Sequence, residues 1–313
     1  MKKIFFILFL IILMSCVNDE PGDVVFSSNV VQITGTRYSA SNVDFENTYS
    51  GFITALNEED SLEVFLEIDH AANAIATGRV LDATSLVFFR NPEISNLLLR
   101  ENQLAGLDLP QKMLFFQNEN SEVFAVYNAV AYLASRYGIE QAGNLQNSAT
   151  VLNDLSTNAT MAEIRSSADL VVEPEQGIIT KDSPHTFAET YAEVRNNINS
   201  RENLEFLAEI DFQADAEYQT EGNEENEETG LKPTRLIIFG MPDLGTALMQ
   251  GSQTLALDFP QKILVWEDEE GIVRISYNDP AFLAERHNLT TNPEELEQII
   301  TILDEISGIA SAN

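Results

Sequence analysis

The amino-acid sequence predicts an α+β protein built from two tandem copies of a compact domain, each a mainly antiparallel sheet packed with helices. Three observations predict this fold. The chain contains an internal repeat, its strand patterns are joined by hairpin signals with helical patterns between them, and its 313 residues have an ordinary globular composition that suits two domains. Because related copies in one chain often pack as a pseudo-dimer, we also expect a pseudo-twofold arrangement.

The repeat is most regular in the second half of each copy. Residues 86–137 and 236–287 align without a gap at an offset of 150, with 19 identities in 52 positions. Upstream the offset is 142, so that Glu67-Ile68-Asp69 matches Glu209-Ile210-Asp211. The difference of eight places an insertion at residues 221–228 of the second copy, and its acidic composition predicts a solvated loop.

The second copy shows the order of elements most clearly, and the first copy repeats it. Apolar periodicity distinguishes its helices from its strands, and prolines and acidic residues indicate where helices begin. The predicted elements are a helix over 187–198, strands over 204–210 and 235–239, a helix over 242–250, a hairpin of strands 263–266 and 272–277, a short helix over 280–286 and a final amphipathic helix over 293–309.

The N-terminus reads as a lipoprotein signal peptide. Met1-Lys2-Lys3 is basic, and residues 4–14 are an unbroken run of eleven apolar residues, too short to span a bilayer. The run ends in Leu13-Met14-Ser15-Cys16, which resembles a lipobox. We therefore expect cleavage before Cys16, the chain's single cysteine, and lipidation of its thiol with palmitate-type chains that anchor the protein to a membrane.

The residues after Cys16 bear on which membrane holds the protein. Aspartate directly after the lipidated cysteine resembles an inner-membrane retention signal, and here that position is Val17. Acidic residues slightly further on, here Asp19 and Glu20, resemble surface-export signals. We expect an envelope location at the outer membrane, with surface exposure as a further expectation. The acidic pair also fits a plain solvated tether.

The charge balance excludes several classes of partner. The formal net charge is −33, and removal of residues 1–15 takes away two lysines, leaving 15 basic against 50 acidic residues, or −35. Nucleic acid is excluded because its phosphates require a basic surface. Electrostatic docking on anionic lipid is excluded for the same reason. The lipid anchor is then the expected membrane contact.

Repeat boundaries and terminal signals together predict the domain organisation. We expect a lipoprotein signal peptide at 1–15, a tether at 16–27, a first and more diverged repeat domain at 28–160, a linker at 161–176 and a second repeat domain at 177–313.

Several stretches of the second copy carry a family resemblance. They are residues 183–190 (SPHTFAET), 236–242 (LIIFGMP), 245–249 (GTALM), 257–268 (LDFPQKILVWED) and 276–280 (SYNDP). With these stretches the chain resembles the domain-of-unknown-function 302 family, well over about 177–309 and more loosely over 28–156. The resemblance implies a compact α+β domain with a curved sheet backed by helices and a tendency to pair.

The first copy departs from the family pattern at two glycines. Arg90 stands where the second copy has Gly240, and Ser95 where it has Gly245. Because the backbone freedom of glycine is lost there, a ligand that approaches this turn closely in the second copy is expected to be excluded from the first.

The three histidines of the chain, His70, His185 and His287, each fall where the family pattern shows histidine. They are divided between the copies, because Val43, Phe212 and Tyr137 occupy the opposite places. If equivalent edges of the copies meet, the three could form one composite site, with a carboxylate such as Asp69 as a further ligand of zinc or another transition metal. The alternative is structural: His185 lies at a predicted helix start and His287 in a last helical turn, where a cation favours the helix dipole.

A shared Leu-Asp-(Leu/Phe)-Pro-Gln-Lys segment supplies two more candidates. In a functional interpretation Asp258 pairs with Lys262, and Asp108 with Lys112, as polar ligands at the start of a strand. In the structural interpretation the segment is a turn, in which proline forces its predecessor to be extended.

No catalytic template is present: the sequence lacks a nucleophile elbow, a His-Glu-x-x-His motif, paired Cys-x-x-Cys residues and glycine-rich phosphate loops. The favoured prediction is therefore a non-enzymatic, envelope-anchored module that binds a small ligand or an envelope protein. The alternative is a metal-binding or histidine-assisted enzyme that uses His185, His287 and His70, and a purely structural role stays open. The sequence does not indicate a cofactor.

Overall fold

The computed structural model describes residues 32–139, 145–167, 169–220 and 230–308. Contacts divide the chain into two compact units, Met1–Val30 and Val31–Asn313, and all described residues belong to the second. The predicted signal peptide, the lipidation site Cys16, the tether and the acidic insertion at 221–228 lie outside the described residues.

The first copy forms a six-stranded antiparallel sheet in the order β2-β3-β4-β5-β1-β6. Its strands alternate with helices, as the sequence pattern predicts. The elements are β1 (Thr36–Ala40), α1 (Phe45–Asn57), β2 (Glu63–Asp69), α2 (His70–Ala76), β3 (Thr84–Arg90), α3 (Pro92–Glu101), the 3-10 helix η1 (Gln103–Asp108), β4 (Gln111–Gln117), β5 (Val123–Asn128), α4 (Val130–Arg136), α5 (Gln146–Thr160) and β6 (Arg165–Ser166).

The second copy forms a five-stranded antiparallel sheet in the order β7-β11-β10-β9-β8, which matches the first sheet strand for strand apart from β6. The elements are β7 (Ile178–Ser183), α6 (Phe187–Asn199), β8 (Glu205–Asp211), α7 (Phe212–Thr220), β9 (Thr234–Gly240), α8 (Pro242–Gly251), the 3-10 helix η3 (Gln253–Leu257), β10 (Gln261–Glu267), β11 (Val273–Asn278), α9 (Pro280–Arg286) and α10 (Pro293–Gly308).

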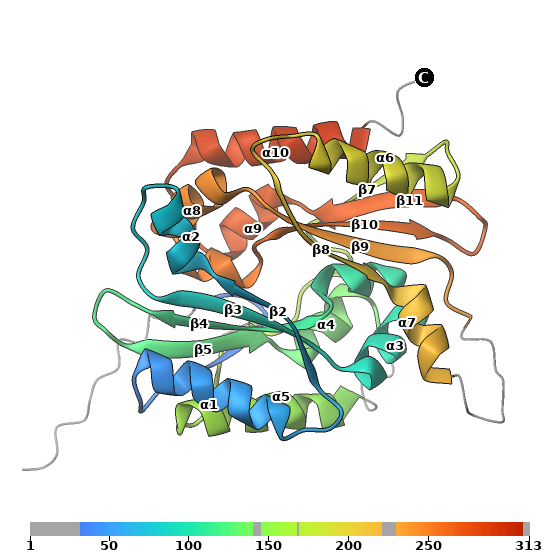
Figure 1. Cartoon of the computed structure of the whole chain (residues 1–313). Coiled ribbons are helices and arrows are strands. Elements are labelled where there is room, and N and C mark those ends of the chain that lie inside the picture. The colour runs from blue at the N-terminus through green and yellow to red at the C-terminus, as the bar shows by residue number, and fades with distance from the viewer. Residues whose placement is uncertain (1–31, 140–144, 168, 221–229, 309–313) are drawn as a thin grey trace, which may run out of the picture. The chain divides into compact units, whose positions relative to one another are not determined.

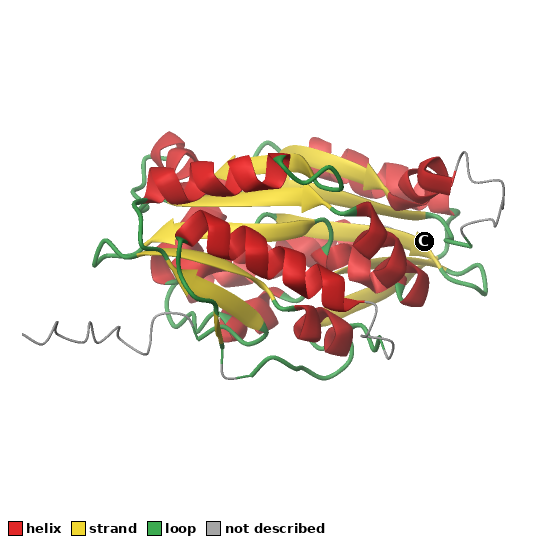
Figure 2. Ribbon diagram, turned by 90° about the horizontal axis from the view of Figure 1, so that it is seen from below, coloured by secondary structure: helices red, strands yellow, loops and turns green. Residues whose placement is uncertain are grey.

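Helices cover the outer face of each sheet, as Figure 1 shows, with α1 and α5 on the first and α6 and α10 on the second. Figure 2 shows the sheets as neighbouring layers between these helices. In the first copy the helices bury Phe52, Leu56, Leu152 and Leu155 against the strands. Burial of such apolar side chains is the main force that holds a helix on a sheet.

Local signals explain where several helices begin. Asp44 caps α1 by accepting a hydrogen bond from the backbone of Asn47, and Thr186 and Glu189 form a capping box at the start of α6. Helices α3 and α8 both begin with proline, which lacks only an N–H that the first turn would leave unpaired.

The two copies pack through reciprocal contacts. The Gln103 side chain donates hydrogen bonds to Thr234 Oγ1 at 2.7 Å and to the Glu267 carbonyl at 3.0 Å. Each residue has its counterpart 150 positions away, because Gln253 donates to Thr84 Oγ1 at 2.8 Å and to the Gln117 carbonyl at 3.0 Å. Contacts of this exchanged kind define a twofold interface. The predicted two-copy α+β fold with a pseudo-twofold is confirmed.

The sequence pattern missed three elements of the second copy and one strand in the predicted linker before it. Strand β7 has a mixed sequence, helix α7 has no strong apolar stripe, and η3 is shorter than a periodicity window. The predicted linker at 161–176 contains β6, where Ser166 pairs with Arg37 of β1.

Candidate functional site

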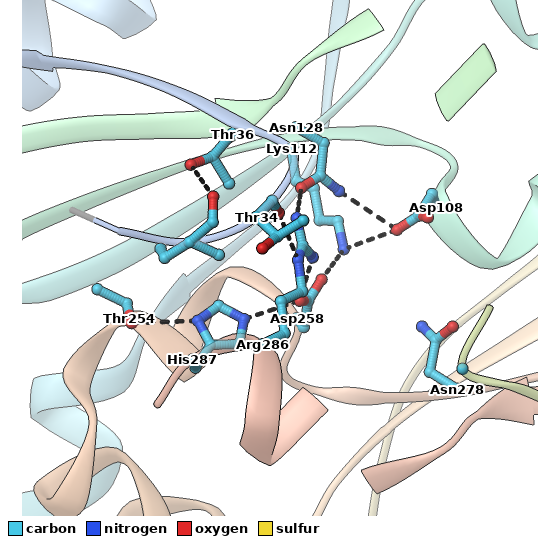
Figure 3. Close-up of polar contacts among 12 residues, drawn as sticks. Thr34, Thr36, Asp108, Lys112, Asn128, Thr254, Asp258, Asn278, Arg286 and His287 are labelled. Atoms are coloured by element: carbon cyan, nitrogen blue, oxygen red, sulfur yellow. Dashed lines mark hydrogen bonds and ion pairs between the residues drawn. The ribbon is translucent and has the colours of Figure 1, made fainter. Parts of the chain in front are cut away.

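A buried polar network lies where the two copies meet (Figure 3). Arg136 donates to Asp108 Oδ2 at 2.8 Å and to Asn278 Oδ1 of the other copy at 2.9 Å. Its counterpart Arg286 donates to Asp258 Oδ2 at 2.5 Å and, across the interface, to Asn128 Oδ1 at 2.7 Å. We call the following residues the interface network: Asp108, Lys112, Asn128, Arg136, Tyr137, Asp258, Lys262, Asn278, Arg286 and His287.

The carboxylates of the interface network are ionised. Burial alone would raise the pKa of Asp258, but the charges of Arg286 and Lys112 and a hydrogen bond with His287 hold it well below the usual range. Burial likewise opposes ionisation of Asp108, whose pKa is lowered by Lys112 and Arg136. Buried carboxylates require such partners, because an unpaired charge in the interior is very costly.

The two equivalent lysines differ in their surroundings. Lys112 Nζ contacts Asp258 at 3.0 Å and Asp108 at 3.4 Å. Burial lowers its pKa, but the two carboxylates outweigh burial and raise it. Within the described residues Lys262 donates one hydrogen bond, to the Asp258 carbonyl at 3.2 Å, and burial and the charge of Lys112 lower its pKa to about 7.

This geometry corrects the predicted pairing of Asp258 with Lys262. The carboxylate of Asp258 forms ion pairs with Arg286 of its own copy and with Lys112 of the other copy, whereas Lys262 donates to the backbone carbonyl of Asp258. The segment does form a turn between η3 and β10, yet the side chains of Asp258 and Lys262 are only 2% and 3% exposed. The turn interpretation therefore misses a role in joining the two copies.

His287 belongs to the same network as a neutral hydrogen-bonding group. Its Nε2 lies 2.9 Å from Asp258 Oδ2 and its Nδ1 3.1 Å from Thr254 Oγ1. Burial lowers its pKa, so the expected stabilisation of the helix dipole by a cation does not apply. In the first copy Tyr137 donates to Asp108 at 2.7 Å. Because histidine and tyrosine meet the same need for a donor, the position is structural.

His70 lies in a different place, in a pocket built by both copies. The first copy contributes Ile68, His70 and Asn73, and the second contributes β8, the start of α8 and the turn before β10. Its empty volume is about 480 Å³ when the open solvent at its mouth is counted, and about 50 Å³ of that space admits the centre of a water-sized sphere. We call it the His70 pocket.

The pseudo-twofold generates a second pocket at the equivalent place. It is lined by Ile210, Phe212 and Asp215 from the second copy and by Arg90 and Ser95, among others, from the first. We call it the Phe212 pocket. Here Phe212 replaces His70, and Arg90 stacks over Phe65 at 4.6 Å and lies 3.5 Å from Asp215.

Two glycines form part of the wall of the His70 pocket. A Cβ atom at Gly240 would meet neighbours no nearer than 3.8 Å, and one at Gly245 none nearer than 3.6 Å. Neither glycine has a positive φ. The expected reason for a difference between the copies, backbone freedom, therefore does not apply at these glycines. What they provide is the absence of a side chain, because atoms beyond Cβ would occupy space at the pocket. The exclusion of a ligand from the first copy stays a prediction.

The His70 pocket holds two buried polar atoms without hydrogen-bond partners in the described part of the chain, His70 Nε2 and Thr246 Oγ1. Burial lowers the pKa of His70 to about 4, against the opposing charge of Asp69, so its imidazole is neutral at neutral pH. Buried polar groups nearly always have partners, and an unpartnered pair in a pocket indicates a place for a ligand group or water.

The remaining predicted site residues do not join either site. Asp69 caps α2 by accepting from the Ala72 backbone at 2.9 Å, and His185 lies just before α6, 3.9 Å from Glu193. Across the described ranges no group of three or more His, Cys, Asp or Glu side chains is placed to hold a metal ion. The structure does not gather the three histidines into a composite metal site, because each lies among different partners.

Sequence reasoning also missed several members of these sites. Arg136, Arg286, Asn128 and Asn278 are retained in both copies at an offset of 150, which signals a shared role without revealing that their partners lie in the opposite copy. Thr246 belongs to the family-like stretch 245–249, but the internal repeat does not mark it, because its equivalent in the first copy is Asn96.

The fold and the pockets define a class of protein: a fused pair of α+β domains with two equivalent pockets at their shared interface. The family model described as "Domain of unknown function DUF302" matches residues 37–158 and 179–306. The chain therefore belongs to this family, with one family domain in each copy, as the resemblance predicted.

Curated relatives and a solved structure show partial likeness. A protein of Brucella suis biovar 1 named "Fluoride-specific ion channel FluC 1" is 40% identical over 115 residues, which cover 37% of this chain and 42% of the relative. A Brucella melitensis biotype 1 protein named "Fluoride-specific ion channel FluC 2" has the same identity over 39% of its length. The chain thus spans about two fifths of the curated relatives it matches.

The solved structure is that of an uncharacterized conserved DUF302 protein from Bacillus stearothermophilus. It is 16% identical, with a TM-score of 0.34, and the match covers 42% of this chain and 96% of that one. Within the described part of the present chain, no helix combines the length and apolar character needed to cross a membrane.

Proposed function

We propose that this chain is an envelope-anchored, non-enzymatic module that binds a small ligand in the His70 pocket. The observation that carries the proposal is the pocket itself, where His70 of one copy faces the Gly240 and Gly245 wall of the other and two buried polar atoms have no partner. The paired copies act as the two halves of one site. Preformed pockets with a few placed polar groups are typical of small-molecule binding.

Anchoring is the second part of the proposal. The basic start, the apolar run and the Leu-Met-Ser-Cys sequence ending at Cys16 support lipidation and an outer-membrane location. The acyl chains would hold the binding unit at a membrane without any electrostatic attraction, which a chain of net charge −33 lacks. Fractionation of cells that express Cys16→Ala tests this part, and a variant that stays in the membrane fraction contradicts it.

The binding part is tested by screening a mixed set of small anions, cations and neutral compounds by NMR. The sample is residues 31–313, which form a compact unit by themselves. Wild type is compared with His70→Phe and Gly240→Arg, which introduce the residues of the Phe212 pocket. We expect compounds that bind wild type to lose most of their affinity for both variants.

The matched controls are Phe212→His and Arg90→Gly, which make the reverse exchange in the equivalent pocket. We expect both to bind the same compounds as wild type does. Binding that survives in His70→Phe and Gly240→Arg, or the absence of any binding compound, would show that the His70 pocket is not a ligand site.

A further inference from the structure

The chemistry of the His70 pocket restricts what it can bind. Most of its wall is apolar, supplied by residues such as Met241, Met249, Phe259 and Ile299. Among the described residues that line it there is no lysine or arginine, and Glu205, on an exposed position of β8, is the single carboxylate. The unpartnered buried polar atoms are those of a neutral imidazole and a hydroxyl, and Gln261 adds a buried, uncharged amide to the lining.

We propose that the ligand is an uncharged, mainly apolar small molecule with one hydrogen-bonding group, such as a hydroxyl, that is met by His70 Nε2 and Thr246 Oγ1. This inference rests on the proposed function and specifies its ligand class. A hydroxyl both donates and accepts, so it suits one imidazole nitrogen and one threonine oxygen. The apolar remainder of the molecule then replaces water against the methionine and phenylalanine side chains.

Charged ligands fit this pocket poorly. An anion would lie beside Glu205 without a basic partner, and the neutral His70 supplies no positive charge. A cation would find its only lining carboxylate on an exposed position, away from the buried polar pair. Removing a charge from water without a buried partner is costly, so the unpaired neutral atoms favour a neutral group.

The Phe212 pocket would not take the same ligand. Its equivalent of His70 is a phenylalanine, which offers no hydrogen bond, and its equivalents of Gly240 and Asn73 are the charged Arg90 and Asp215. We therefore expect one site for this ligand in each chain, although the fold contains two equivalent pockets.

The experiment uses four probes that share one ring: benzyl alcohol, toluene, benzoate and benzylammonium. The protein is residues 31–313 with carbon-13 in the methionine methyl groups. Met241 and Met249 line the pocket, whereas Met113 is buried in the first sheet and Met161 is exposed, so the last two serve as internal controls. The alcohol is expected to shift the first two signals most strongly, with toluene weaker and the ions weakest.

Two variants separate hydrogen bonding from filling of space. Thr246→Val keeps the shape of the side chain and is expected to weaken the binding of benzyl alcohol about fivefold, which corresponds to the loss of one hydrogen bond. The affinity for toluene is expected to stay unchanged. His70→Gln retains a hydrogen-bonding group and is expected to keep more of the alcohol affinity than His70→Phe.

The outcomes distinguish this inference from the proposed function. Tighter His70-dependent binding of benzoate or benzylammonium would overturn the ligand class and leave the pocket as a binding site. Equal binding of alcohol and toluene, unchanged in Thr246→Val, would remove the role of the polar pair. If no probe shifts Met241 or Met249, the ligand class is wrong, and the broader screen decides whether the pocket binds anything.

Discussion

At the scale of single residues, the three histidines show how burial and partners decide what one side chain does. His287 is buried with two hydrogen-bond partners, which makes it a structural group. His70 is buried, and its Nε2 has no hydrogen-bond partner among the described residues, which is why we propose that a ligand meets it. His185 is about a quarter exposed beside Glu193. The sequence places all three in the family pattern, but only the packing separates their roles.

The neutral state of His70 predicts a pH dependence of stability. In the folded protein its pKa is about 4, against 6.5 for a free histidine, because it is buried. Between these values unfolding takes up a proton, so this contribution to the free energy of unfolding is lost as the pH falls from about 6.5 towards 4. The loss is at most about 1.4 kcal/mol per pH unit.

Urea unfolding of wild type and His70→Phe between pH 7 and pH 5 tests this prediction. Both contain His287, whose lowered pKa acts in the same direction, and both keep the neighbouring carboxylates Asp69 and Glu205. The free energy of unfolding of the variant should therefore still fall as the pH is lowered, but less steeply than that of wild type, because the contribution of His70 is missing. Phe212→Leu is the matched control. It is expected to change the urea concentration at the midpoint of unfolding but not the dependence of the free energy of unfolding on pH. An identical slope in wild type and His70→Phe would contradict a neutral buried His70.

At the scale of elements, helix α8 keeps a glycine where a better helix former would fit. Gly245 lies inside the helix, and an added Cβ would meet only the Phe259 ring, at 3.6 Å and 3.8 Å. Glycine in a helix interior costs about 1 kcal/mol relative to alanine. Its presence is consistent with a need for open space at the pocket.

Gly245→Ala is expected to raise the free energy of unfolding by about 1 kcal/mol while weakening ligand binding in the His70 pocket. The matched control is Gly106→Ala in η1, where a Cβ would lie 2.8 Å from Leu264 Cδ1 and 3.0 Å from Phe212, so that variant should be destabilised. Chemical unfolding of the two variants beside wild type measures both changes. A destabilised Gly245→Ala would mean that the glycine is needed for packing.

Elements with a strong local signal could be predicted from the sequence, and those without one could not. The buried strands β9 and β10 contain apolar runs, β11 alternates apolar and polar residues, and α6, α8 and α10 have an apolar periodicity, so the local pattern was sufficient. Strand β7 carries polar and charged residues within IITKDS, because its neighbours cover it on one face only.

The candidate sites were harder to predict because their members come from different copies. The difference between Gly240 and Arg90 can be seen in the sequence, and the structure places these residues in the two equivalent pockets. Contacts such as Lys112 with Asp258, 146 positions apart, depend on how the copies dock. No local pattern carries that information.

At the scale of the whole compact unit, the interface network joins the two copies through buried charge. Near neutral pH it holds the carboxylates of Asp108 and Asp258 against Lys112, Arg136 and Arg286, which carry the opposite charge. Among the described residues, Lys262 is the one cation of the interface network that has no carboxylate within ion-pair distance. Removing one partner of a buried ion pair lowers the free energy of unfolding strongly, because the other charge is left buried without a partner. Removing a buried group that has no ionic partner leaves no such charge behind.

The two equivalent lysines should therefore respond in opposite ways. Lys112→Met leaves two buried carboxylates short of a partner and is expected to destabilise the protein by about 3–5 kcal/mol. Lys262→Met removes an amine that burial penalises and is expected to leave stability unchanged or raise it at pH 7.

Unfolding measured at two pH values gives a second check on the different surroundings of Lys112 and Lys262. The pKa of Lys262 is about 7 in the folded protein against 10.5 when free, so its unfavourable contribution fades as the pH rises from 7 towards 10.5. Lys262→Met should lack this gain, seen as a smaller difference between unfolding midpoints at pH 7 and pH 9. Equal destabilisation by the two substitutions would contradict the assigned pairing.

The fusion of the two copies into one chain has a genetic consequence. In a dimer of identical chains every substitution appears twice, so a change that spoils one pocket spoils its twin. Here Arg90 and Phe212 alter one pocket while Gly240 and His70 persist in the other. A gene that encodes both halves lets mutation and selection act on each half separately, so one half-site can drift or acquire a new preference while its counterpart is preserved.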